Sequence, residues 1–451
     1  MRLSVAVKRL FALTIAPLIS LAALALGPGA AYALPAFAAQ TGQPCQACHV
    51  GGLGPQLTEF GRKFKLEGYT LRVNNNIPLA AMVQVSATQT QKDVQPPVPS
   101  FAANGNFAFD QTSLFLAGGL GEHVGAFIQA TYDGVAHAFH WDQTDVRFTE
   151  KAQFMGQNLV TGISINNAPG VQDPWNTLPS WGFPYTFSEL APSPGTVPLL
   201  NGAFSQDTLG ATAFVWLNNE YYAEFGEYAS PGAGTLRRLG ADPTAPGDID
   251  GAAPYGRLAW QHHVMGGALE LGAFGMAAAI HPGLDRTTGA TDHYDDLGLD
   301  GSYIKTLPNS DVITVNARYL HERQNLLATC ALDGVTTGCS DNHLDDVRVD
   351  VAYYWRNWIG LTVQGFNTSG NGNPTLYAGN RTLSPDSTGA VIQLDATPFG
   401  GEPQPQRRVN VRVGLQYFLY TRFNGASSNF DGAGTKASDE NAFRVFAWFM
   451  F

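Results

Sequence analysis

The stretch with the clearest chemical signature is Cys45–His49, which reads C-Q-A-C-H. A C-x-x-C-H motif is the attachment site of a c-type haem: two thiols add to the haem vinyl groups and the adjacent imidazole ligates the iron. The chain has only 4 Cys and 10 His in 451 residues, so this spacing is a specific signal. We therefore expect one covalent haem c, bound through Cys45 and Cys48, with His49 as the proximal iron ligand.

The segment around the motif offers no second iron ligand, because no other His and no Met occurs between Leu34 and Ala81. Either the iron is five-coordinate or the rest of the chain supplies the sixth ligand. Met82 is the first candidate, since it is an apolar residue on the polar face of an expected strand close to the motif. A thioether ligand raises the haem potential. The alternative is that Met82 only packs against the haem, and Met276 is the second candidate.

A short helix is expected directly after the motif, over residues 58–66. Thr58 is suited to cap its start and Gly68 to end it. Phe60 and Phe64 are spaced i, i+4, so they share one side of such a helix. We expect these two rings to cover one face of the haem.

The N-terminus has the composition of a secretory signal peptide. Basic residues precede an apolar run over 10–26, and Ala31–Ala33 is a small-x-small cleavage site. A membrane-anchoring helix is the alternative, but the run is short for a span and Pro17 interrupts it. We predict a signal peptide over 1–33, and export agrees with haem attachment in the periplasm.

The body of the chain is acidic, poor in charge and rich in aromatic residues. The net charge is −11, charged residues make up 14% and aromatic residues 11%, and there are 50 Gly. Residues 34–76 carry an excess of basic side chains, so the remainder is still more acidic. This asymmetry favours docking of the haem segment on the body and argues against nucleic acid as a partner. After the predicted signal no run of 18 apolar residues occurs, so we expect no transmembrane helix.

Many stretches alternate between apolar and polar residues, as half-buried strands do. In 346–354, for example, Val347, Val349 and Val351 share one face, and Arg348 and Asp350 share the other. Residues 296–303 and 311–321 follow the same rule. The chain ends in an apolar, aromatic stretch with a terminal Phe, which resembles the closing strand of bacterial outer-membrane proteins.

About sixteen such strands can be placed over residues 77–451, with long connections alternating with short ones. Long outer loops and short periplasmic turns produce this pattern in outer-membrane barrels. Fourteen strands is the alternative, because 388–396 is the weakest strand. The predicted fold class is all-β, a transmembrane antiparallel β-barrel of about 16 strands, in which a small α-helical haem segment, 34–76, plugs or caps the lumen.

The longest loop, 167–204, is rich in Pro and aromatic residues. It could fold inward as a constriction or lie outside as a cap, and the sequence favours neither. In another outer loop, Cys330 and Cys339 are expected to form a disulfide in an oxidising compartment, with a metal site near His343 as the alternative. A further group of polar residues in an outer loop is either an entry site for Fe²⁺ or simply a solvated loop. Its members are His137, His140 and Asp142.

The chain resembles the fused outer-membrane monohaem cytochrome c–porins of iron-oxidising bacteria. The resemblance rests on the run AFAAQTGQPCQACH, on FGRKFKLEGYT after it, and on a barrel-like remainder that ends in Phe. In that family a monohaem cytochrome is thought to plug or cap a sixteen-stranded barrel and to take electrons from extracellular Fe²⁺.

The resemblance implies a location in the outer membrane, in contact with its lipid, with the haem segment in the lumen or at its periplasmic side. It implies electron transfer from extracellular Fe²⁺ to a periplasmic c-type cytochrome, that is, Fe²⁺:cytochrome c oxidoreductase activity. Two rival interpretations remain. One is a diffusion porin whose haem segment is a plug or sensor, and the other is outward electron delivery to extracellular acceptors.

Overall fold

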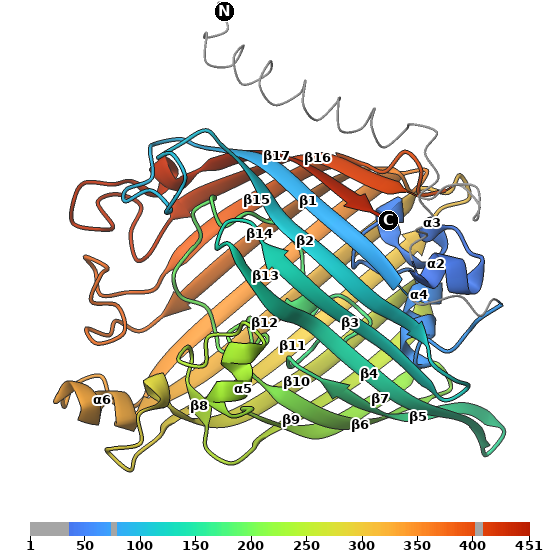
Figure 1. Ribbon diagram of the computed structural model, residues 1–451, viewed down its shortest axis with the longest axis horizontal. Coiled ribbons are helices and arrows are strands. Elements are labelled where there is room, and N and C mark those ends of the chain that lie inside the picture. The colour runs from blue at the N-terminus through green and yellow to red at the C-terminus, as the bar shows by residue number, and fades with distance from the viewer. Residues whose placement is uncertain (1–35, 74–78, 402–408) are drawn as a thin grey trace, which may run out of the picture.

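The structure is a computed structural model, and it describes residues 36–73, 79–401 and 409–451. The predicted signal peptide and the predicted domain boundary at 76/77 lie outside the described residues. Within the described part, one antiparallel sheet closes on itself to form a barrel (Figure 1). The described helices include none that is both long and apolar enough to span a membrane.

Sixteen strands follow one another around the barrel in chain order, and β17 pairs with β1 to close it. A seventeenth strand, β8 (Asp248–Ile249), has two residues and only extends the edge of β10. The all-β antiparallel barrel and its strand count are therefore confirmed, and the weakest predicted strand is present as β15. The sixteen strands are β1 (Leu79–Thr90), β2 (Asn106–Gly119), β3 (Val124–Asp133), β4 (Ala138–Phe154), β5 (Gln157–Asn166), β6 (Leu209–Leu217), β7 (Tyr221–Ala229), β9 (Ala253–Val264), β10 (Gly267–His281), β11 (Asp292–Thr306), β12 (Val312–Leu326), β13 (Asn342–Trp355), β14 (Ile359–Gly370), β15 (Ser387–Ala396), β16 (Asn410–Arg422) and β17 (Ala442–Met450).

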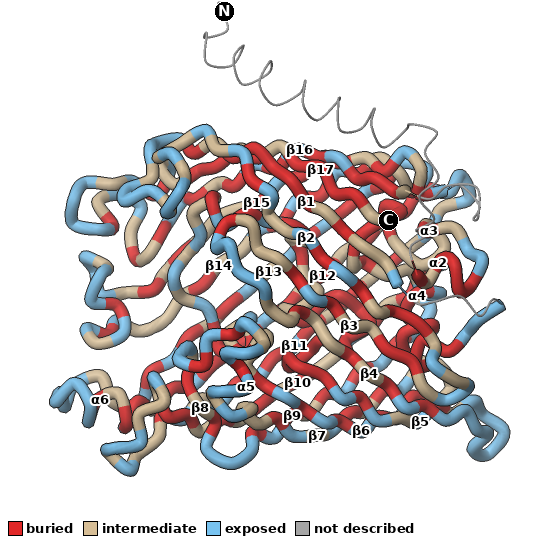
Figure 2. Tube along the Cα trace, viewed as in Figure 1, coloured by how far each residue is buried: buried red, intermediate tan, exposed pale blue. Residues whose placement is uncertain are grey.

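The predicted alternation holds along the strands. In β13, Val347, Val349 and Val351 are exposed on the outside, whereas Asp350 and Tyr354 are buried inside. Figure 2 shows the same alternation of buried and less buried residues on neighbouring strands. An apolar outer surface around a polar interior is what a barrel in lipid requires, because closure leaves no unpaired strand edge in the membrane.

The two ends of the barrel differ. Short turns join the strands at one end, here called the short-turn end, and most connections at the other, the long-loop end, are long. Three short helices precede the barrel, α2 (Ala36–Thr41), α3 (Cys45–Cys48) and α4 (Glu59–Leu66), and they lie at the short-turn end. Helix α6 (Leu327–Asp333) lies at the long-loop end (Figure 1). The remaining short elements are η1 (Val50–Gly52), η2 (Pro179–Trp181), α5 (Ala233–Arg238), η3 (Pro282–Leu284) and η4 (Ala437–Glu440).

The longest connection, residues 167–208, folds into the lumen and is here called the inner loop. Its Asp173 lies against Arg257 of β9, and its Phe183 carbonyl accepts a hydrogen bond from Gln364 of β14 at 2.8 Å. Its Thr186 donates to Gln84 of β1. The loop therefore touches well-separated parts of the wall, and the wall's polar side chains satisfy its backbone, as a buried loop requires. The sequence allowed this loop to fold inward or to lie outside as a cap, and in the structure it folds inward.

Candidate functional site

Residues 36–73, here called the N-terminal segment, contact inward-facing side chains of many strands. Tyr69 donates to Asp145 of β4 at 2.7 Å, and Asn410 of β16 donates to the Gly52 carbonyl at 2.8 Å. Arg412 donates to the Leu53 carbonyl at 2.6 Å. The segment is thus fixed by hydrogen bonds to strands far apart in the chain.

The C-x-x-C-H motif begins with one short helix, α3, and packs against a second, α4. Cys45 to Cys48 form the single turn α3, and Thr58 caps α4 by accepting a hydrogen bond from Gly61 N at 3.2 Å. The Thr58 backbone N–H also donates to the Cys48 carbonyl at 2.9 Å. A Cβ on Gly61 would lie 2.3 Å from that carbonyl, so only glycine allows α4 to approach the motif this closely. The predicted helix after the motif is confirmed, with the predicted cap.

All three motif residues line one cavity of about 400 Å³. Its walls come from three parts of the chain: the N-terminal segment, the barrel wall and the inner loop. The aromatic and thioether side chains that line it are Phe37, Phe64, Tyr69, Met82, Phe115, Phe127, Trp181, Tyr185, Phe187, Trp448 and Met450. The cavity is therefore largely apolar, although Asp142, Asp173 and several amide side chains also reach it.

His49 is held as a neutral imidazole. Its Nδ1 is buried and has no hydrogen-bond partner among the described residues. Burial lowers the pKa of His49 to about 4; the backbone of Gly54 acts in the opposite direction and the charge of Arg412 lowers the pKa further. A neutral imidazole is the form that can ligate a metal.

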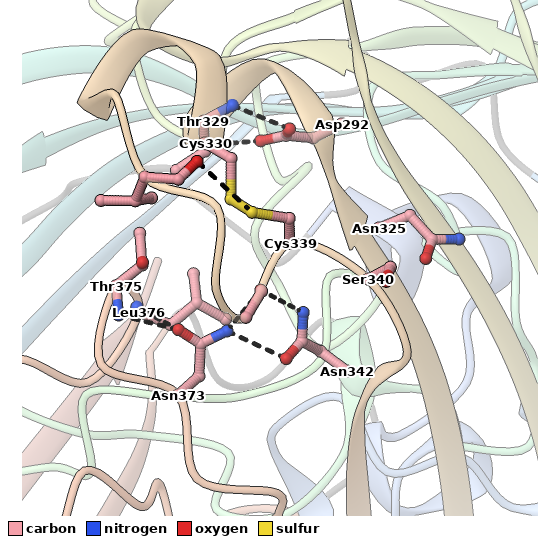
Figure 3. Close-up of a disulfide and its surroundings, with 12 residues drawn as sticks. Asp292, Asn325, Thr329, Cys330, Cys339, Ser340, Asn342, Asn373, Thr375 and Leu376 are labelled. Carbon is pink, nitrogen blue, oxygen red and sulfur yellow. Dashed lines mark hydrogen bonds between the residues drawn. A yellow bond between two sulfur atoms is a disulfide. The ribbon is translucent and has the colours of Figure 1, made fainter.

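Cys45 and Cys48 are free thiols that share the cavity wall. Burial raises the pKa of both, and that of Cys48 reaches about 12, to which the neighbouring Cys45 contributes. Both groups are therefore protonated thiols in this fold near neutral pH. Cys330 and Cys339 instead form a disulfide that ties α6 to the loop after it, and Thr329 of the same helix bonds to Asp292 (Figure 3).

The two predicted haem-covering rings have different positions. Phe64 is buried and lines the cavity, with its ring 5.0 Å from that of Phe37. Phe60 is 38% exposed and does not line it. The reason is that the first turn of α4 lies at the rim of the barrel, where Glu59 bonds to His263 near the end of β9. Phe60 thus lies outside the cavity that the motif lines, and its contact with a haem stays a prediction.

Met82 faces the lumen, as predicted, and lines the same cavity as the motif. It is only 3% exposed, and Gln84 lies 3.6 Å from its sulfur. Met276 does not line this cavity; it packs with Tyr255 in a separate apolar cluster.

Met450 was missed by the sequence reasoning, although it also lines the cavity. It pairs directly with Met82 across the β1–β17 seam. Its position on the same face of the last strand as Arg444 and Trp448 was visible in the sequence. What the sequence could not supply is the closure that brings the last strand next to the first.

The proposed metal groups in the loops do not assemble. Among the described residues, no cluster of three or more His, Cys, Asp or Glu is arranged to hold a metal ion. Asp142 in particular faces inward and accepts a hydrogen bond from Thr131 at 2.7 Å, away from His137 in the turn. His262 and His321 each bond to an acidic neighbour, Glu220 and Asp345 respectively.

Comparison with known proteins gives similar solved structures but no matching family. No family model and no curated protein matches the chain. Among solved structures it is similar to the outer membrane channel DcaP of Acinetobacter baumannii, with 11% identity over 85% of this chain and 99% of that chain (TM-score 0.49). OprB of Pseudomonas putida has 13% identity over 82% and 92% (TM-score 0.48), and an anion-selective porin from Comamonas acidovorans 12% over 82% and 98% (TM-score 0.43). These likenesses carry no conclusion about the family or the activity of this chain, and the closed antiparallel barrel rests on its own strand pairing.

Proposed function

We propose that Cys45, Cys48 and His49 hold one haem c in the cavity that they line. The donor set supports this proposal, because two free thiols and a neutral imidazole lie together at the wall of a cavity of about 400 Å³. That volume is within the usual range for cofactor sites, and the wall is largely apolar. When bound, a haem c supplies reversible one-electron chemistry at its iron.

The side chains around the motif have separate tasks in this proposal. Phe64 of α4 and Trp181 of the inner loop both line the cavity, and they exclude water from it. Met82 is the proposed distal ligand, because its buried thioether lines the same cavity. A Met opposite a His raises the potential of a c-type centre, which suits a weakly reducing donor.

We further propose that the chain transfers electrons across the outer membrane. Fe²⁺ outside the cell is oxidised to Fe³⁺, and a ferric c-type cytochrome in the periplasm is reduced. The motif lies at the short-turn end, and short turns mark the periplasmic end of outer-membrane barrels. This position supports electron transfer to a periplasmic cytochrome. The donor follows from the family resemblance, and outward electron delivery uses the same site in reverse.

The contents of the lumen favour electron transfer over the diffusion of solutes. The N-terminal segment occupies the short-turn end, and the inner loop contacts β1, β9 and β14 across the interior. A diffusion porin needs an open path between these parts of the wall. The single observation that carries the proposal is that the C-x-x-C-H motif lines an apolar cavity inside a closed barrel.

The test compares the full-length protein with a Cys45→Ser/Cys48→Ser variant, both produced where c-type haem is attached. The expected result is a covalent haem spectrum that Fe²⁺ reduces without oxygen in the native protein and that is absent from the variant. Cys330→Ser/Cys339→Ser is the matched control and keeps the haem. Liposomes that swell freely in small solutes, together with a haem that Fe²⁺ leaves oxidised, would support the diffusion porin instead.

A further inference from the structure

Two hydrogen-bond donors in the wall of the cavity that the motif lines are buried and have no acceptor. They are the hydroxyl of Tyr185, from the inner loop, and the indole N–H of Trp448, from β17, and neither has a partner among the described residues. Two other lining residues carry a buried, unpartnered atom, but His49 Nδ1 belongs to the motif and Gln143 Oε1 is itself an acceptor. Buried donors are almost always paired in folded proteins, so these two indicate an acceptor in the cavity.

The two donors share one part of the cavity wall, although they come from distant parts of the chain. Trp448 is 6% exposed and packs with Met82 in an apolar cluster, and Tyr185 packs against the same cluster. Thr186, the next residue after Tyr185, donates to Gln84, and Gln84 is the direct cross-strand neighbour of Trp448. The inner loop is therefore bonded to the wall beside Trp448, and this contact holds Tyr185 on the same side of the cavity.

The acidic side chains of the cavity wall do not serve as the acceptor. Asp142 accepts a hydrogen bond from Thr131 at 2.7 Å, and Asp173 accepts one from the Trp175 backbone N–H at 3.0 Å. Neither carboxylate bonds to either of the two free donors, which have no partner in the described part of the chain. The acceptor that the two donors require therefore belongs to a molecule that the cavity binds.

Both groups keep their proton and can donate it to a hydrogen bond. Burial raises the pKa of the Tyr185 phenol well above its usual value; the charge of Asp350 acts in the same direction, and that of Arg412 opposes it. The indole N–H of Trp448 is a donor only. Arg412, the cross-strand neighbour of Trp448, is already paired with Asp395 at 2.9 Å, so the acceptor is held by hydrogen bonds rather than by a free cation.

We propose that Tyr185 Oη and Trp448 Nε1 donate hydrogen bonds to a propionate carboxylate of the haem. This inference rests on the proposed haem site. A haem is apolar over its macrocycle and carries its charged oxygen atoms only on its two propionate groups, so these are the acceptors that it brings into the cavity. Hydrogen bonds to an ionised acceptor are shorter and stronger than those between neutral groups. The two residues thus help to orient the haem and to set its potential.

The test is resonance Raman spectroscopy of the full-length, haem-loaded protein, because the propionate bending bands report on hydrogen bonds to these carboxylates. The variants are Tyr185→Phe and Trp448→Phe, each of which keeps an aromatic ring and removes one donor. Tyr69→Phe is the matched control, since Tyr69 lines the same cavity but its hydroxyl donates to Asp145 at 2.7 Å. We expect a propionate band to shift to lower frequency in each site variant and to stay in place in Tyr69→Phe.

A second measurement separates this contact from a purely structural role. Tyr185→Phe should lower the temperature at which the haem-loaded barrel unfolds, but not that of a Cys45→Ser/Cys48→Ser barrel, where the hydroxyl has no acceptor to lose. The heat-dependent shift in gel mobility of a folded barrel gives both temperatures. Propionate bands that stay at the native position in both site variants, or an equal loss of stability in both backgrounds, would overturn this inference and leave the proposed haem site intact. Native protein without covalent haem would overturn both.

Discussion

Gly61 determines how closely α4 approaches the C-x-x-C-H motif, because a Cβ there would meet the Cys48 carbonyl at 2.3 Å. We predict that Gly61→Ala displaces α4 and lowers the amount of covalently bound haem per barrel. Gly365→Ala is the control, since a Cβ at Gly365 has no atom within 4 Å. The ratio of haem absorbance to protein in purified samples measures the effect. Equal ratios in the two variants would show that this contact does not position the motif.

The two methionines at the seam of the barrel allow a direct test of the distal ligand. Met82 is buried, whereas Met450, its cross-strand partner, is partly exposed. A buried thioether competes better with water for an iron, so we expect Met82→Ala to convert a low-spin haem spectrum into a high-spin one. Met450→Ala should keep the low-spin bands. The opposite outcome would make Met450 the distal ligand, and unchanged spectra in both variants would exclude both methionines as ligands.

Lys65 links the docking of α4 to pH. Burial lowers the pKa of Lys65 to about 7, although Asp145 raises it, and its Nζ donates to the Val171 and Asp173 carbonyls of the inner loop. In the released segment the pKa is near 10.5, so between these two values the released state binds more protons. Docking therefore becomes more stable as pH rises from about 7 to about 9, by ~2 kcal/mol, and it loses this gain as pH falls through 7.

Hydrogen-exchange protection factors of the α4 amides measure this dependence. Lys65→Met should abolish it, whereas Lys63→Met, at an exposed position of the same helix, should leave it intact. A pH dependence that survives in Lys65→Met would mean that another group is responsible.

Among the elements, the inner loop is the part that crosses the lumen beside the cavity lined by the C-x-x-C-H motif. It contacts β1 through Gln84 and β14 through Gln364. We predict that replacing residues 175–200 with a short Gly-Ser linker raises single-channel conductance well above that of the native protein, because the wall then encloses an open path.

Conductance is measured in planar bilayers, and the control variant is Cys330→Ser/Cys339→Ser. This variant loosens a different loop at the long-loop end, the one that contains α6. A native protein that already conducts like the shortened variant would show that the inner loop is no barrier.

At the scale of the whole molecule, the sequence was most informative where local rules dominate. Alternation in stretches such as Val347–Tyr353 predicted the strands, and the C-x-x-C-H spacing predicted which side chains share a site. The Cys330–Cys339 pairing also followed from proximity along the chain and an oxidising compartment. Each of these depends on residues only a few positions apart.

The sequence failed where closure and long-range packing decide. Met450 meets Met82 only because the last strand pairs with the first. Phe60 lies outside the cavity because the first turn of α4 lies at the rim of the barrel. The inner loop lies in the lumen, where it contacts wall residues such as Arg257.

We propose that this barrel conducts electrons through a haem held by Cys45, Cys48 and His49. Liposomes that contain the protein and enclose ferricytochrome c, with Fe²⁺ added outside in the absence of oxygen, test this proposal. We predict reduction of the trapped cytochrome, seen in its absorption bands, and no reduction with a folded Cys45→Ser/Cys48→Ser barrel. Trapped cytochrome that stays oxidised with the native protein, or is reduced equally fast with the variant, would contradict it.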